Sequence, residues 1–209
     1  MRFYTFQVAP NPTRVGLYLA EKTAAGAAMN VENVIVNLAK REHRSSEHIA
    51  RNPLGRLPVL ELDNGSFLTE STVIVEYLEE LHPDPPMIGT TAEERARVRE
   101  LERIAELGVL VPIARIVHAT KSPLGLPPNP EIAALFDKLL PEGLGLLNDK
   151  LSDGRAFLAG DCPTIADCTL QAGLQFGRYG KIKFDLPEQL ARWDLNYRER
   201  DPALSVLVL

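Results

Sequence analysis

The sequence is poor in cysteine: only Cys162 and Cys168 occur among its 209 residues. This excludes a small secreted fold that is held together by disulfides. A structural zinc site is not expected either, because such a site needs clustered Cys and His ligands. We interpret the two thiols as buried apolar fillers, and we predict a protein without bound metal in the reducing cytoplasm.

Long apolar runs and excess positive charge are missing as well. No segment approaches the roughly 20 apolar residues that span a bilayer, and residues 1–10 resemble a strand more than a signal peptide. The formal net charge of −5 argues against a nucleic-acid surface, which would be basic. The remaining composition, 45% hydrophobic and 24% charged, is that of an ordinary globular protein without membrane or nucleic-acid partners.

The first half of the chain alternates strand and helix signals. β-Branched and aromatic residues mark strands, spaced apolar residues mark helices, and Asp63-Asn64-Gly65 predicts a hairpin turn. The resulting order, β-α-β-α-β-β-α with a strand that starts at Pro58, is the thioredoxin-like α/β arrangement. The predicted strands are Arg2–Val8, Val34–Leu38, Val59–Leu62 and Ser66–Leu68, and the predicted helices are Pro12–Lys22, Ser46–Arg51 and Ser71–Leu81.

The second half contains only helix signals. The proline-rich run His82–Gly89 predicts a domain boundary, with a thioredoxin-like domain at 1–82, a linker at 83–89 and an all-α domain at 90–209. Pro112 should kink the first long helix or mark a join, and Pro141-Glu142-Gly143 should interrupt the second. The predicted helical stretches are 92–119, 131–151, 164–177 and 187–200.

The most informative stretch runs from Asn52 to Leu60 and continues at Leu68–Ser71. A proline cannot donate a ladder hydrogen bond, so Pro58 must start its strand or lie in a turn, which leaves the Leu57 backbone free. Glu70-Ser71 opens a helix whose N–H groups and positive dipole end attract an anion. The stretch therefore predicts a site for a small peptide that carries a carboxylate.

The run NPLGRLPVLELDNGSFLTESTVIVEYLEE resembles the glutathione transferase superfamily, and the resemblance covers most of residues 1–90. The later run CPTIADC is similar to the N-capping motif of that family's core helix. The resemblance implies a cis Pro58, a Leu57 backbone that pairs with the glutathione cysteine, and Glu70 and Ser71 on the γ-glutamyl group. It also implies a cation for the glycine carboxylate, and the two candidates are His43 and Arg56.

The residue that faces the glutathione sulfur departs from the common pattern. Family members use Tyr, Ser or Cys, but the usual Ser position falls on Ala9, which has no donor. The segment Ala9-Pro10-Asn11-Pro12 instead resembles bacterial Nu-class members, in which an Asn faces the sulfur. Asn11 is thus the candidate donor and Thr13 the reserve, and the alternative is that Asn11 merely caps a helix.

The resemblance implies a homodimer in which glutathione is the cosubstrate and an electrophile binds between the domains. Val111, Arg115 and Tyr179 are candidates for the electrophile site, and the alternative is that they serve core or surface packing. Three functions stay open: a transferase that adds glutathione to an electrophile, a glutathione-dependent disulfide or thioether-cleaving oxidoreductase, and a non-catalytic binding protein with this fold.

Overall fold

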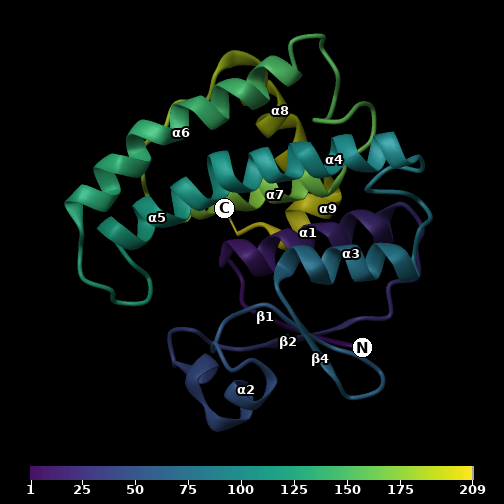
Figure 1. The fold of residues 1–209 in the computed structure, drawn as a ribbon, viewed down its shortest axis with the longest axis vertical. Helices are drawn as coiled ribbons and strands as arrows, with labels where there is room; N and C mark the ends of the chain where they lie inside the picture. The colour runs from purple at the N-terminus through teal and green to yellow at the C-terminus, as the bar shows by residue number, and fades with distance from the viewer. Residues whose placement is uncertain (209) are drawn as a thin grey trace.

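The computed structural model describes residues 1–208, and their first half forms a four-stranded mixed sheet with strand order β2-β1-β3-β4. The elements are β1 (Arg2–Thr5), α1 (Pro10–Ala24), β2 (Glu32–Ile35), the 3-10 turn η1 (Glu42–Arg44), α2 (Ser46–Arg51), β3 (Val59–Glu61), β4 (Phe67–Thr69) and α3 (Ser71–Leu81). β1 runs parallel to β2 and antiparallel to β3, and β3 and β4 are antiparallel. α1 and α3 cover one face of the sheet, and α2 lies beyond the other (Figure 1). The predicted thioredoxin-like arrangement is confirmed.

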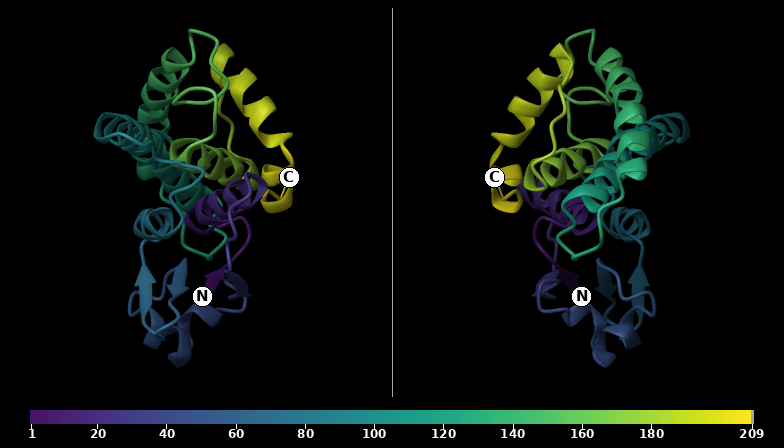
Figure 2. Two further views of the ribbon diagram at one scale, coloured as in Figure 1. Left: turned by 90° about the vertical axis from the view of Figure 1, so that its right-hand side faces the viewer. Right: turned by 90° about the vertical axis from the view of Figure 1, so that its left-hand side faces the viewer.

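The second half of the described chain is helical and lies over α1 and α3, on the side away from the sheet (Figure 2). Its elements are α4 (Ala92–Ala105), the π-helical segment η2 (Glu106–Leu110), α5 (Val111–Thr120), α6 (Pro130–Lys150), α7 (Ile165–Tyr179), α8 (Glu188–Arg198) and α9 (Asp201–Val206). α7 is central, because every residue from Ile165 to Gly177 is buried. None of the described helices is long and apolar enough to cross a bilayer.

Element boundaries differ from the sequence prediction at several points. β1 ends at Thr5 and β2 ends at Ile35, so both strands are shorter or earlier than predicted. In the first long helical stretch the π-helical segment Glu106–Leu110 separates α4 from α5, and Pro112 lies in the first turn of α5, which fits the predicted join. α9 was not predicted as a separate helix.

α6 runs unbroken through Pro141, so the predicted interruption at Pro141-Glu142-Gly143 is wrong. The glycine has another use, because η2 and α6 approach each other at Gly108 and Gly143. A Cβ built on Gly143 would lie 2.2 Å from the carbonyl oxygen of Gly108. Both sides of this contact are backbone, so no side-chain rotation could relieve the clash.

Replacing Gly143 with alanine should therefore lower the free energy of unfolding by about 1–3 kcal/mol, the usual cost of overpacking. Gly145→Ala is a matched control in the same helix, because a Cβ there meets nothing within 4 Å. We expect the control to gain about 0.5–1 kcal/mol through better helix propensity. Urea denaturation measures both values, and a stabilised Gly143→Ala protein would contradict the close contact.

One hydrophobic core joins the two halves of the chain. Phe3 and Leu60 of the sheet and Tyr18 of α1 belong to the same cluster of buried side chains as Leu174 of α7 and Trp193 of α8. The helical half therefore completes the core of the sheet-containing half and packs against α1 and α3.

A buried lysine holds the proline-rich segment that follows α3. Lys22 is fully buried, and its Nζ lies 2.8 Å from Glu79 Oε2. Nζ also donates to the carbonyl oxygens of His82 and Pro85, at 2.5 and 2.6 Å. Because the pair is hydrogen-bonded on both sides, neither ion is left uncompensated in the core. Glu79 additionally accepts hydrogen bonds from Tyr18 Oη and from the backbone amides of Met87 and Ile88.

The capping box predicted at the start of α7 is confirmed. Thr164 donates to Asp167 Oδ2 through both its backbone N–H and its hydroxyl, each at 2.9 Å. Cys168 follows and is buried, as predicted, but the prediction for Cys162 is wrong. Cys162 is exposed because it lies in the loop ahead of the helix rather than on its core face.

Candidate functional site

The chain turns sharply ahead of β3 at the Leu57–Pro58 peptide bond, which is cis. The carbonyl oxygen of Arg56 accepts hydrogen bonds from His48 Nε2 and Asn52 Nδ2, both at 3.0 Å, and these bonds fix the approach to the turn. Within residues 1–208 the backbone amide and carbonyl of Leu57 have no hydrogen-bond partner. They are free to pair with an extended peptide ligand.

α3 begins directly after β4 at Glu70 and Ser71. Glu70 is exposed and has φ 68° and ψ 115°, a strained conformation for a residue other than glycine. It is the N-cap residue and no side chain caps the helix, so the alternative of a Thr69 or Ser71 cap is wrong. The buried Ser71 hydroxyl and the first-turn N–H groups can meet a carboxylate, and Glu70 can accept from an ammonium group.

Asn11 lies in the first turn of α1, not at its cap. The N-cap residue is Ala9, so the alternative that Asn11 caps the helix is wrong. Asn11 Oδ1 accepts a hydrogen bond from Arg14 Nη2 at 3.0 Å and a longer one from Ser71 Oγ at 3.5 Å. Val8, a β-branched residue with φ 66°, is strained in the loop that leads to this helix. The structure thus brings Asn11 and Ser71 together at the starts of α1 and α3.

An apolar cavity of about 120 Å³ lies next to the start of α1. Tyr179, one of the predicted electrophile residues, lines it together with Phe176 of α7. Val111 and Arg115 both lie on α5 but do not line this cavity. A small apolar molecule would fit the mostly aromatic and aliphatic wall. The other lining residues are Phe6, Val8, Ala9, Pro10, Leu38, Ala39, His118, Pro123 and Leu124.

Comparison with known proteins points to one family. Residues 1–80 match the glutathione S-transferase N-terminal domain. Glutathione S-transferase 2 of Saccharomyces cerevisiae is 32% identical over 219 aligned positions, which cover 99% of this chain and 89% of the relative. The chain belongs to the glutathione S-transferase family. The crystal structure of Gtt2 from the same yeast agrees, with a TM-score of 0.86, 32% identity and coverage of 99% of this chain and 100% of that one.

Bacterial proteins are similar to this chain as well. A glutathione S-transferase domain-containing protein of Marinobacter aquaeolei VT8 has a TM-score of 0.85 and 32% identity, covering 97% of this chain and all of the other. The maleylacetoacetate isomerase of Pseudomonas aeruginosa is 37% identical over 101 residues, 47% of this chain and 45% of the relative. The family uses glutathione as cosubstrate. Among the described residues no group of three or more His, Cys, Asp or Glu side chains could hold a metal ion.

The two residues predicted for the glycine carboxylate lie on neighbouring loops. His43 is buried in η1, whereas Arg56 is exposed. A Cβ built on Gly55, which has φ 58°, would lie 3.0 Å from the His43 carbonyl oxygen, so the two loops touch. Burial and the nearby Arg44 lower the pKa of His43, which leaves its ring neutral at pH 7. Of these two residues, only Arg56 carries a positive charge at pH 7, and His43 can offer a neutral hydrogen bond.

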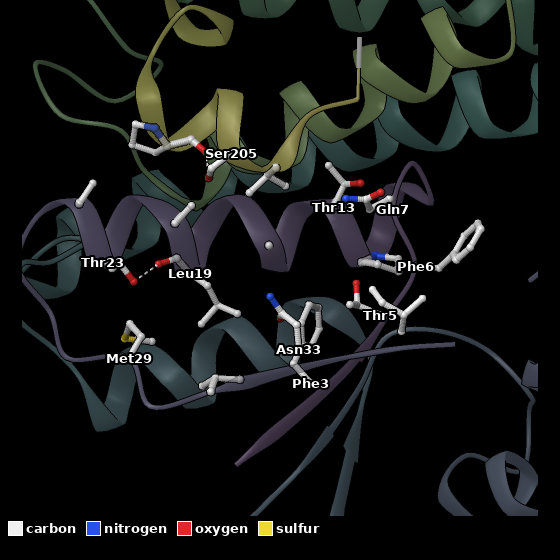
Figure 3. Close-up of a pocket in the computed structure, with 18 of the residues that line it drawn as sticks. Phe3, Thr5, Phe6, Gln7, Thr13, Leu19, Thr23, Met29, Asn33 and Ser205 are labelled. Carbon is white, nitrogen blue, oxygen red and sulfur yellow. Dashed lines mark hydrogen bonds between the residues drawn. The ribbon is translucent and has the colours of Figure 1, made fainter. Parts of the chain in front are cut away.

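Thr13, which the sequence predicts as the reserve sulfur donor, is buried and lines a different cavity. Its Oγ1 accepts a hydrogen bond from Gln175 Nε2 at 3.5 Å. The cavity measures about 510 Å³ and lies between α1, β2 and α9, where Thr13 lines it together with Asn33 and Ser205 (Figure 3). The structure therefore does not group Thr13 with Asn11 and Ser71.

Sequence reasoning missed His118, which lines the small apolar cavity next to the start of α1. Its Nδ1 lies 3.0 Å from Ser122 Oγ. The tautomer in which Nδ1 donates to that hydroxyl leaves Nε2 as a proton acceptor. Burial and the charge of Arg115 lower the pKa of His118, so the ring is neutral at pH 7. A His and a Ser four residues apart at a helix end was the sequence signal that could have drawn attention to it.

Proposed function

We propose that this protein is a glutathione transferase that ionises glutathione and directs the thiolate at a small apolar electrophile. The observation that carries the proposal is the meeting of Asn11 and Ser71 beside the cis Pro58 turn, next to an apolar cavity. Three features are therefore adjacent: a backbone segment that can bind a peptide, a helix start that can bind an anion, and a cavity that can hold a second substrate.

Glutathione binds as an extended tripeptide in this proposal. The Leu57 backbone pairs with the cysteine residue, as an added strand would. Ser71 and the first turn of α3 hold the γ-glutamyl carboxylate, while Glu70 accepts from its ammonium group. Arg56, with His43 beside it, meets the glycine carboxylate at the other end.

Asn11 stabilises the thiolate. A free thiol has a pKa of about 8.5, so little of it is ionised at neutral pH. The side-chain amide of Asn11 can donate to the sulfur, and the N-terminus of the 15-residue helix α1 adds a positive dipole end. Lowering the thiol pKa by about two units requires roughly 2.7 kcal/mol, which one hydrogen bond to an anion and one dipole end can supply.

His118 accepts the thiol proton in this mechanism, and the pH dependence follows from its lowered pKa. Activity should fall as the pH drops through a value below about 6.5, because the protonated ring can no longer accept. We expect His118→Gln to lower kcat/KM by about 100-fold or more and to leave only the acid limb of the glutathione thiol itself. Arg115→Gln should move the limb of His118 to higher pH, because the Arg115 charge lowers the pKa of His118. An unchanged kcat/KM in His118→Gln would contradict the role.

Calorimetric titration with glutathione tests the proposal directly. Saturable binding is expected, and no binding at millimolar concentration would refute glutathione-dependent chemistry of any kind. Parallel assays then separate the reaction classes: an aromatic halide for transfer, hydroxyethyl disulfide for the oxidoreductase alternative, and a maleyl compound for the isomerisation that the names of two relatives indicate. Binding without turnover of any of these would favour the non-catalytic alternative.

The proposal includes a homodimer in the cytoplasm, as the family resemblance implies. α4 presents many charged side chains, which suits a polar contact between subunits. Sedimentation velocity measures the mass of the particle in solution, and a monomer at micromolar concentration would contradict this part.

A further inference from the structure

Arg14 is a buried charge that the glutathione motif leaves without a role. Only 2% of its side chain is exposed. Nη1 lies 3.0 Å from Glu102 Oε1 of α4, and Nη2 lies 3.0 Å from Glu106 Oε1 of η2. Glu102 Oε1 also accepts a hydrogen bond from Thr169 of α7 at 3.0 Å. Two carboxylates from the helical half therefore hold the guanidinium of an α1 residue in one position.

The third partner of Arg14 is Asn11, whose Oδ1 accepts from Nη2 at 3.0 Å. Ser71 Oγ approaches the same Oδ1 at 3.5 Å. A guanidinium can only donate, so the Asn11 atom that faces it must be the carbonyl oxygen. Rotating the amide by half a turn would set N–H groups against N–H groups. Nδ2, the donor end of the amide, is therefore turned away from Arg14.

We infer that Arg14 is a positioning residue that fixes the Asn11 amide so that Nδ2 is presented to the glutathione sulfur. The inference rests on the proposed function, in which Asn11 binds that sulfur. Arg14 itself is too deeply buried to touch the ligand and acts only through Asn11. Glu102 and Glu106 hold Arg14 in position. These two residues of the helical half therefore fix the orientation of the Asn11 amide toward the ligand.

The conservative variant Arg14→Lys tests this, because an ammonium on a flexible stem cannot bridge Asn11 and two carboxylates as a planar guanidinium does. The pH titration of the ultraviolet thiolate absorbance of bound glutathione is the readout. We expect the midpoint to rise by about one pH unit, a tenfold loss of thiol acidity. Affinity for S-methylglutathione, which has no ionisable thiol, should stay the same.

A double-mutant cycle separates positioning from a direct effect of charge. Asn11→Ala should raise the midpoint by as much as Arg14→Lys, and adding Arg14→Lys to Asn11→Ala should raise it no further. An equal additional rise in the double variant would show that Arg14 acts without Asn11 and would overturn the inference.

Two further outcomes distinguish the inference from the proposed function. If Asn11→Ala raises the midpoint and Arg14→Lys does not, the inference is wrong while the proposed function stands. If glutathione does not bind to the native protein, or if Asn11→Ala leaves the midpoint unchanged, Asn11 does not stabilise a glutathione thiolate. The proposed role of Asn11 and the inference about Arg14 are then both wrong. Should Arg14→Lys fail to fold, the pair Arg14→Met and Glu102→Met carries the same test, because it removes both buried charges together.

Discussion

Replacing Asp167 with alanine is expected to lower the free energy of unfolding by about 3–5 kcal/mol, the range seen when a buried charge network loses one member. The carboxylate is fully buried. Its Oδ2 accepts both hydrogen bonds from Thr164, and its Oδ1 accepts from the Leu158 amide at 3.0 Å and from Trp193 Nε1 at 2.9 Å. Alanine leaves these donors without partners inside the protein, and each costs about 1–3 kcal/mol.

Part of this free-energy cost is offset, because burial destabilises the charged carboxylate of Asp167 in the native protein. Burial raises the pKa of Asp167, which shows that its charged form is poorly solvated there. Alanine removes the cost of burying this charge. The expected loss in the free energy of unfolding is therefore smaller than the sum over the broken hydrogen bonds. Thermal and urea denaturation measure it, with the exposed Asp161→Ala as control. A loss of less than about 1 kcal/mol would mean that water replaces the carboxylate.

The second large effect is expected for Ser71→Ala in glutathione binding. Hydrogen bonds to charged groups contribute about 1.5–3 kcal/mol, which corresponds to a rise of about 10- to 150-fold in the Kd for glutathione. Ser71 is the first residue of α3 and its hydroxyl is not used to cap the helix, so the fold should tolerate the change.

Isothermal titration measures that Kd, and the melting temperature reports the fold. Ser205→Ala on α9, whose hydroxyl bonds only to the Pro202 carbonyl, is a serine control remote from the motif. Its affinity should equal that of the native protein. A Ser71→Ala protein with native affinity would place the γ-glutamyl carboxylate elsewhere.

The parts of the fold that could be predicted are those with a local cause. Pro58 at a strand start, Asp63-Asn64-Gly65 between two strands, and Thr164 three residues ahead of Asp167 each specify their own turn or cap. Together with the runs of β-branched residues and of spaced apolar residues, these signals predicted the thioredoxin-like order, which the strand pairing confirms.

What could not be predicted depends on contacts between distant residues. Asn11 has a cap-forming side chain, yet α1 begins one residue earlier, and its oxygen is taken by Arg14. Pro141 and Gly143 are residue types that commonly end a helix. Here Gly143 instead allows the close approach of the Gly108 backbone in η2. His118 lies in an unremarkable helix and becomes a candidate only because its cavity also holds Ala9 and Pro10.

The contacts of Lys22 and Glu79 with the segment after α3 limit where this chain can be joined to a relative in a chimaera. A crossover placed at Leu81, where the last helix of the sheet-containing half ends, would separate Glu79 from the amides of Met87 and Ile88. It would also take the Pro85 carbonyl from the Lys22 ammonium. A chimaera that imports a new helical half, and with it a new electrophile cavity, should therefore keep the native chain as far as Ile88.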